Sequence, residues 1–107
     1  MKRVTVLNVV GLTRSVMAEM PRLKEWSKRQ EVASFKPAFP AVTCTAQSSY
    51  LTGKTAGQHG IVGNGWYDRE DAEVKFWKQS NHLVKGEKVW EAAGVQCAKM
   101  FWWYNMY

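Results

Sequence analysis

The segment from residue 39 to residue 68 carries the side chains best suited to chemistry. It is nearly uncharged, holds five of the eight glycines, and is rich in hydroxyls: Thr43, Thr45, Ser48, Ser49, Thr52 and Thr55. A hydroxyl ahead of a helix, such as Thr43 or Thr45, has two possible roles. It can cap free N–H groups, or it can attack an anion such as phosphate, which the donors and dipole of a helix N-terminus favour. Capping residues far outnumber nucleophiles, so spacing alone favours the cap by about two to one.

Residues 48–55 end in the Gly-Lys-Thr of a phosphate-binding loop. That loop also requires an earlier glycine, a strand before it and a helix after it. Position 48 is serine, no strand leads into the segment, and Gly57 and Gly60 interrupt a following helix. We therefore reject this type of nucleotide-binding loop.

Other reactive side chains have simpler interpretations. Cys44 has no neighbouring His or Asn in the sequence to support a catalytic thiol, so we expect a small buried residue. Cys44 and Cys97 lack metal-ligand spacing and are too few for a disulfide scaffold, which predicts free thiols in a reducing compartment. His82 is expected at the surface. Four acidic residues could bind a metal, although a solvated loop is favoured by about four to one: Asp68, Glu70, Asp71 and Glu73.

Alternating strands and helices are expected to position these side chains. Residues 4–10 are almost all apolar or β-branched, which suits a strand buried on both faces of a parallel sheet. Pro21 suits the first turn of a helix. Further helices are predicted at residues 45–52 and 87–93, each followed by a glycine. The remaining strands are predicted at residues 32–38, 73–78 and 95–103. This order predicts an α/β layer with a mainly parallel sheet.

The net charge of +6 belongs to the N-terminal third of the chain. Residues 1–36 hold 8 basic and 3 acidic groups, residues 37–67 hold only Lys54, and the remainder is balanced. A nucleic-acid-binding domain needs basic residues on one face, and here Glu25 and Glu31 interrupt the basic series. We expect no nucleic-acid partner and keep that function as the least favoured alternative.

The apolar runs of the sequence are short. None approaches the roughly 20 residues of a membrane span, and no cleavage site follows the run at residues 4–12. We therefore expect a cytoplasmic protein without membrane association.

Aromatic residues gather in the C-terminal part of the chain. Ten of the fourteen lie in residues 66–107, and the whole chain has six tryptophans. A chain this short has a limited interior in which to place them. The surplus indicates that part of the structure is missing.

Several motifs occur in a fixed order: a strand ending in Gly11, Pro21-x-Leu23, Phe39-Pro40-x-x-Thr43, Leu51-Thr52-Gly53, His59-Gly60-Ile61-x-x-Asn64 and Tyr67-Asp68. In this order the sequence resembles the front part of the type I phosphodiesterase/nucleotide pyrophosphatase family, within the alkaline phosphatase superfamily. The resemblance implies an incomplete α/β fold, namely the N-terminal part of an alkaline-phosphatase-like three-layer α/β/α fold with a mainly parallel sheet. Residues 1–107 would be the N-terminal portion of a much longer domain.

The resemblance also implies a metal-dependent phosphoric ester hydrolase. Thr43 matches the nucleophile that attacks phosphorus and forms a covalent intermediate, which water then cleaves. Two divalent metals, usually zinc, bind and activate that hydroxyl in a complete family domain. The substrate would be a phosphate ester or a nucleotide-like small molecule. Most metal ligands belong to later parts of the domain, so the isolated chain should be inactive, and whether it binds metal is left open.

Two positions depart from the family pattern. Val10 stands where family members carry a metal-binding Asp, and Asn8, on the same strand face, is the candidate neutral metal ligand. Ala46 stands where many members have a phosphate-binding Asn, and Gln47 is the candidate substitute donor. His59 is interpreted as architectural, through a hydrogen bond that fixes its loop. The departures keep open a non-catalytic relative that retains the fold for binding or assembly.

Overall fold

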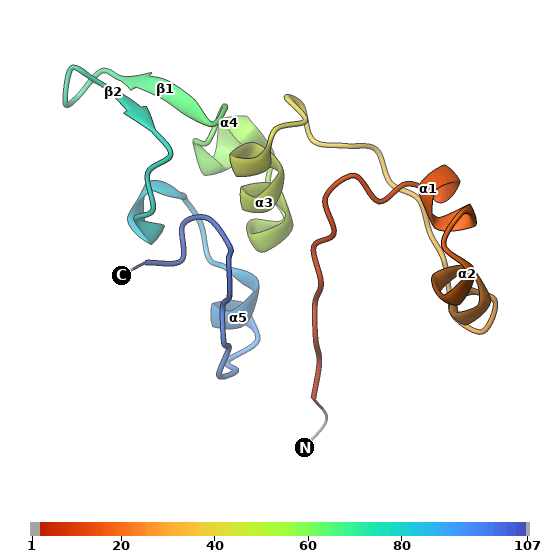
Figure 1. Cartoon of the computed structure of the whole chain (residues 1–107). Helices are drawn as coiled ribbons and strands as arrows, with labels where there is room; N and C mark the ends of the chain where they lie inside the picture. Colours follow the sequence, from red (N-terminus) through yellow and green to blue (C-terminus); the bar gives the residue numbers. More distant parts are fainter. Residues whose placement is uncertain (1–2, 107) are drawn as a thin grey trace. The chain divides into compact units, whose positions relative to one another are not determined.

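The computed structural model describes residues 3–106, which divide after Phe35 into two compact units, each considered by itself. The first unit contains the helices α1 (Arg14–Ala18) and α2 (Pro21–Ser27), which contact each other (Figure 1). Thr13 begins α1, because its Oγ1 accepts a hydrogen bond from the Val16 N–H at 3.2 Å. Pro21 occupies the first turn of α2, as predicted, where its missing N–H leaves no bond unmade.

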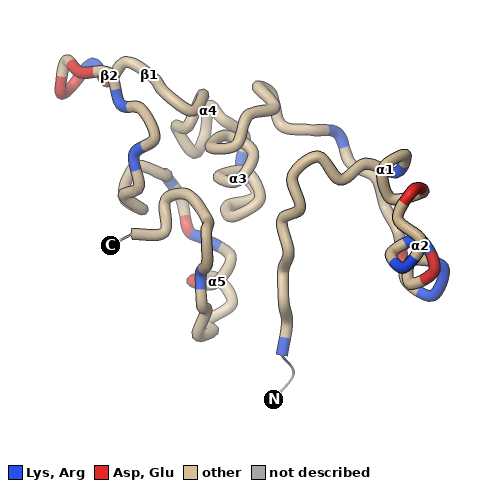
Figure 2. Tube along the Cα trace, viewed as in Figure 1, with Lys and Arg blue, Asp and Glu red and all other residues tan. Residues whose placement is uncertain are grey.

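Charges of both signs lie along α2 and the residues after it (Figure 2). Lys28 pairs with Glu25 at 2.7 Å, and both side chains are largely exposed. Glu25 therefore interrupts the basic series in space as well as in sequence. The interpretation of this helix as a solvated face is supported.

Residues 4–10 do not form the predicted strand. Val4 and Val10 are 86% and 81% exposed. A strand needs a neighbour for its backbone hydrogen bonds, and a run that is apolar on both sides needs cover on both faces. Within residues 3–106 no segment pairs with residues 4–10 or with residues 32–38. Both strand predictions are wrong for this structure.

The second unit is built around α3 (Thr43–Thr52), the longest helix of the described residues. The helix predicted at residues 45–52 is confirmed, with a start two residues earlier. Gly53 ends α3 at φ +66°, a left-handed conformation that glycine adopts readily. The helix α4 (Ala56–His59) packs against α3, so the Gly-Lys-Thr of residues 53–55 joins two helices and follows no strand.

The strands β1 (Gly65–Asp68) and β2 (Glu73–Phe76) form an antiparallel hairpin, with Gly65 opposite Phe76. The strand predicted at residues 73–78 is thus confirmed, whereas residues 95–103 form no strand. Over residues 3–106 this hairpin is the whole sheet, so the predicted mainly parallel sheet is not observed. The described fold is a mixture of helices and a small antiparallel sheet, which is compatible with an incomplete α/β domain.

The chain after the hairpin returns to α3. It contains the 3₁₀ helix η1 (Asn81–Leu83) and α5 (Val89–Ala92), which confirms the helix predicted at residues 87–93. A small core forms where the C-terminal segment reaches α3, and its buried residues are Cys44, Ile61, Val84 and Tyr104, with Trp66, Leu83 and Trp103 packed against them.

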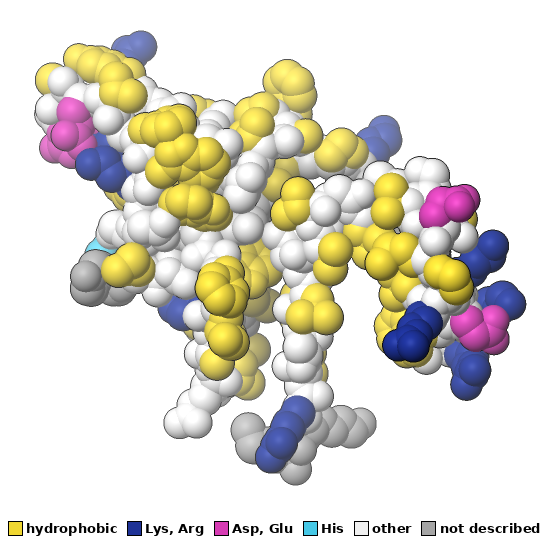
Figure 3. Space-filling model, viewed as in Figure 1, with side chains coloured by type: hydrophobic (Ala, Val, Ile, Leu, Met, Phe, Trp, Pro, Cys, Tyr) yellow, Lys and Arg dark blue, Asp and Glu magenta, His cyan; other side chains and the backbone are white. Residues whose placement is uncertain are grey.

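Much of the apolar surface has no cover in the described residues. None of the six tryptophans is fully buried, and Trp26 is 58% exposed. Figure 3 shows hydrophobic side chains spread over the visible surface. The expectation that so short a chain cannot enclose its tryptophans is confirmed. Over residues 3–106, no helix combines the length and the hydrophobicity that a membrane crossing requires.

Candidate active site

Thr43 is the first residue of α3. Val42 before it is extended (φ −115°, ψ 158°) and occupies the N-cap position without a side-chain hydrogen bond. Thr43 therefore lies inside the helix, and the capping interpretation of Thr43 and Thr45 is wrong. Thr45 is fully buried, and its Oγ1 has no hydrogen-bond partner among the described residues. Thr43 is only partly buried, at the helix end where N–H groups and the positive end of the dipole point outward.

The cap of α3 comes from Asn64, in the glycine-rich loop. Asn64 Oδ1 accepts a hydrogen bond from the Cys44 N–H at 3.0 Å. Its carboxamide therefore lies at the end of α3 that begins with Thr43. Asn64 is a residue of the family motif to which the sequence alone assigned no role. The available signal was an apolar residue at the N-cap of α3, which left the first N–H groups without a local acceptor.

His59 connects α3 to the loop that carries Asn64. Its Nδ1 accepts the Ile61 N–H at 3.1 Å, and its Nε2 lies 3.1 Å from Ser49 Oγ. An accepting Nδ1 places the proton of a neutral ring on Nε2, which therefore donates to Ser49. His59 is fully buried, and this burial lowers its pKa below the ordinary 6.5. The architectural interpretation of His59 is confirmed.

Cys44 follows the candidate nucleophile directly and is fully buried beside Tyr104. Burial raises the pKa of the Cys44 thiol above its ordinary 9.0. The thiol thus stays protonated near neutral pH and is a poor nucleophile. The expectation of a small buried residue is confirmed, and both Cys44 and the exposed Cys97 are free thiols.

Gln47 lies one turn after Thr43 on α3. It is 6% exposed, and its Oε1 accepts a hydrogen bond from the Trp103 N–H at 2.9 Å. The side-chain oxygen of Gln47, the predicted hydrogen-bond donor to phosphate, is thus bound to the backbone of the C-terminal segment. Its amide nitrogen is the atom relevant to the predicted substrate contact, which stays a prediction.

The sequence model of the family described as type I phosphodiesterase / nucleotide pyrophosphatase matches residues 4–107. The chain belongs to this family. The matched range contains Thr43, Asn64 and the loop between them, so the resemblance carried by the motifs is confirmed. Comparison of the phosphodiesterase-family chain with curated proteins and with solved structures gave no significant match.

Membership in the phosphodiesterase family implies metal ions. Within residues 3–106 no group of three or more His, Cys, Asp and Glu side chains is placed to hold one. The predicted ligands Asn8 and Thr43 belong to different units, and their role as metal ligands stays a prediction. Each is also neutral, whereas zinc prefers imidazole, thiolate and carboxylate ligands. The described residues of this phosphodiesterase-family chain therefore do not fit a two-zinc site.

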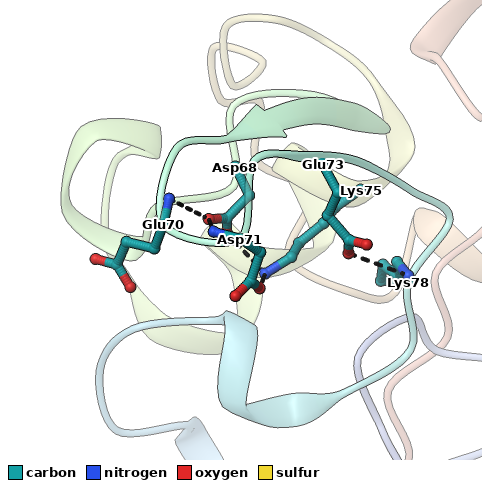
Figure 4. A network of polar contacts seen from close by, with 6 residues as sticks. All are labelled: Asp68, Glu70, Asp71, Glu73, Lys75 and Lys78. Carbon is teal, nitrogen blue, oxygen red and sulfur yellow. Dashed lines mark hydrogen bonds and ion pairs between the residues drawn. The ribbon is translucent and has the colours of Figure 1, made fainter.

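The acidic cluster at the β1–β2 turn is engaged by the protein itself (Figure 4). Asp68 Oδ1 accepts the N–H groups of Glu70 and Asp71 at 2.9 and 3.1 Å. Lys75 pairs with Asp68 at 2.7 Å and also with Asp71, and Glu73 pairs with Lys78 at 3.5 Å. Its bond to Lys75 lowers the pKa of Asp68. The preference for a charged loop over a metal site is supported.

Proposed function

We propose that the chain supplies the nucleophile-bearing part of a phosphoric ester hydrolase, with Thr43 as the nucleophile. The observation that supports this most is the position of Thr43 as the first residue of α3, beside the Asn64 cap. A phosphate group there meets backbone N–H donors and the positive end of the helix dipole. Lys54 is the only charged residue between positions 37 and 67, so this segment adds no carboxylate that would repel phosphate.

In the proposed reaction, Thr43 Oγ1 bonds to phosphorus as the bond from phosphorus to the leaving-group oxygen breaks. The leaving oxygen takes up a proton, and the hydroxyl proton passes to a base. Water then attacks the phosphothreonine, which releases the phosphoryl product and restores the hydroxyl. A threonine hydroxyl needs activation for such an attack. His59 does not fit as the base, because its Nε2 carries a proton and faces Ser49.

We infer that the isolated chain is inactive. Among residues 3–106, no group of His, Cys, Asp and Glu side chains is placed to bind a metal that could activate the Thr43 hydroxyl. His59 is hydrogen-bonded to Ser49 and is not available as a base. In this proposal residues 1–107 form the N-terminal portion of a family domain. Further chain would supply the ligands of two divalent metals, expected to be zinc.

The exposed apolar segments support the same proposal. Residues 4–10 and 95–103 have the composition of strands but pair with no strand within residues 3–106. Val6 and Phe101 are 73% and 95% exposed. In a complete three-layer α/β/α domain, both segments would enter a mainly parallel sheet whose helices cover its two faces.

The substrate class follows from the proposed site. A phosphate ester or a nucleotide-like small molecule places an anionic group at the N-terminus of α3. The amide groups of Asn64 and Gln47 are the proposed side-chain donors to its oxygens. Each donor is anchored through its oxygen, Asn64 on Cys44 and Gln47 on Trp103, so only the amide nitrogen is assigned to phosphate.

An aryl phosphodiester assay with added zinc or manganese tests the proposal. The chain alone is expected to be inactive, and a longer form encoded in frame with it is expected to be active. In that form Thr43→Ala should abolish turnover, whereas Thr43→Ser, which keeps a hydroxyl, should retain part of it. Full activity of Thr43→Ala would reject Thr43 as the nucleophile.

The alternative is a non-catalytic relative that keeps the fold for binding or assembly. It is favoured by Val10 at the position of a family metal ligand and by Ala46 at the position of a phosphate-binding residue. Metal analysis of the longer form separates the two functions. Two tightly bound divalent ions would exclude the non-catalytic alternative, and their absence together with no turnover would support it.

A further inference from the structure

Four contacts lead from α3 through distant segments and back to α3. The Cys44 N–H donates to Asn64 Oδ1, and the Trp77 N–H donates to the Asn64 carbonyl, both at 3.0 Å. The Trp77 indole lies against the Trp103 indole, with ring centres 4.6 Å apart and planes at 37°. The Trp103 N–H donates to Gln47 Oε1 at 2.9 Å. These five residues form a closed contact ring, anchored on the first and the second turn of α3.

The Gln47 link closes the ring. Gln47 is buried, and Trp103 is partly buried against the core. Removing the acceptor would leave the Trp103 N–H without its partner at a partly buried position. Gln47 also follows Thr43 by four residues, so the two side chains lie on the same side of α3, one turn apart. The contact ring therefore holds the helix face that carries Thr43.

Left-handed backbone conformations occur at and beside the stacked pair of Trp77 and Trp103. Trp77 has φ +50°, and Tyr104, directly after Trp103, has φ +57°. Residues other than glycine rarely adopt left-handed backbone angles. They keep such angles only where the surrounding structure holds them. Tyr104 is fully buried in the core, and Trp77 is bound to Asn64 and stacked on Trp103. Trp77 is thus held by contacts of the ring itself, and Tyr104 is held by the core beside it.

We propose that Gln47 is a positioning residue for Thr43, a role that rests on the proposed function of Thr43. A helix anchored at one point can still rotate about its axis or tilt. Anchors at Cys44 and at Gln47, on successive turns, remove both motions and fix the direction of the Thr43 hydroxyl. Gln47 acts through its oxygen on Trp103, and the rest of the contact ring transmits the constraint to the first turn of α3.

Gln47→Met tests the proposal in the chain itself, without an activity assay. Methionine has a similar length but accepts no comparable hydrogen bond, and Gln96→Met, at an exposed position, is the matched control. Hydrogen exchange of the Cys44 amide is expected to accelerate about fivefold relative to the Ile61 amide, the factor of one lost hydrogen bond. The circular dichroism couplet of the Trp77–Trp103 pair should weaken in parallel, and Gln96→Met should change neither signal.

Two further variants keep the test decisive if Gln47→Met unfolds. Gln47→Glu retains an acceptor oxygen and should restore the couplet and the protection of the Cys44 amide. Trp77→Ala opens the contact ring outside α3 and should also accelerate Cys44 exchange relative to Ile61. Equal acceleration of Cys44 and Ile61 in Gln47→Met would indicate general destabilisation and overturn the positioning role. So would unchanged Cys44 exchange in Gln47→Met and Trp77→Ala.

The failure of this inference is distinguishable from a failure of the proposed function. If the variants open the ring as expected but Thr43→Ala keeps full turnover in an active longer form, only the function of Thr43 is rejected. If phosphate protects the chain and Gln47→Met weakens that protection without changing the tryptophan couplet, Gln47 acts only through its amide contact to the ligand. The unchanged couplet would overturn the positioning role and leave the Thr43 proposal standing.

Discussion

Asn64 caps the helix that begins with Thr43. Its Oδ1 accepts the Cys44 N–H at 3.0 Å, across 20 residues of sequence. The local N-cap residue is Val42, which has no side-chain acceptor. This hydrogen bond therefore joins the glycine-rich loop to the first turn of α3.

Asn64→Ala is expected to lower the free energy of unfolding by about 1 kcal/mol, the usual cost of a lost helix cap. Asn64→Asp keeps an acceptor oxygen and adds a negative charge at the helix N-terminus, so it should lose less. Urea denaturation followed by circular dichroism measures both variants. Equal losses in the two variants would contradict the capping role.

His59 is expected to make the protein less stable as the pH falls. Burial lowers the pKa of His59 in the folded state below the 6.5 of the unfolded chain. Below that pH the unfolded chain binds a proton that the folded chain does not, so the free energy of unfolding decreases toward the folded pKa. Denaturation midpoints between pH 7 and about pH 5 should fall less steeply in His59→Gln than in the parent chain. The exposed His82, changed to Gln, is the control and should keep the steep dependence.

The two thiols are expected to react at very different rates. Cys97 is exposed, whereas Cys44 is fully buried and its pKa is raised. In the native chain one thiol should react quickly with a disulfide reagent, and the other at least about tenfold more slowly. In denaturant both should react quickly. Cys97→Ser should remove the fast phase, and a fast native phase in that variant would show that Cys44 is accessible.

Asp68→Asn is expected to loosen the β1–β2 hairpin. The amide keeps an acceptor for the turn N–H groups but loses the charge that pairs with Lys75. Trp66 and Lys75 form a hydrogen-bonded pair of the ladder, because the bond from Trp77 to Asn64 fixes the alternation of paired residues. Exchange of the Trp66 and Lys75 amides should accelerate, and Glu70→Gln, in the same turn, should have no such effect. In the parent chain Asp68 has a lowered pKa, so hairpin protection should be present above its ordinary 3.8 and fall as the pH drops through the folded pKa. Protection that does not change with acid would contradict the role of the ion pair.

Short-range features made much of the second unit predictable. Gly53 and Gly94 ended helices where expected, because a left-handed residue after a helix depends only on local backbone preference. The strand at Glu73–Phe76 followed from alternating charged and apolar residues. The strand at residues 4–10 failed, because a strand depends on a hydrogen-bonded neighbour as well as on its own composition.

The sequence by itself determined the family, through motifs whose order needs no three-dimensional information. It also determined the local elements around Thr43 and the excess of aromatic surface. Tertiary structure decided that Asn64, not Thr43 or Thr45, serves as the side-chain cap of α3, and that Gln47 binds the backbone of Trp103. Those bonds join residues 20 and 56 positions apart. No local propensity reports such a pairing, because it exists only after the intervening chain has packed.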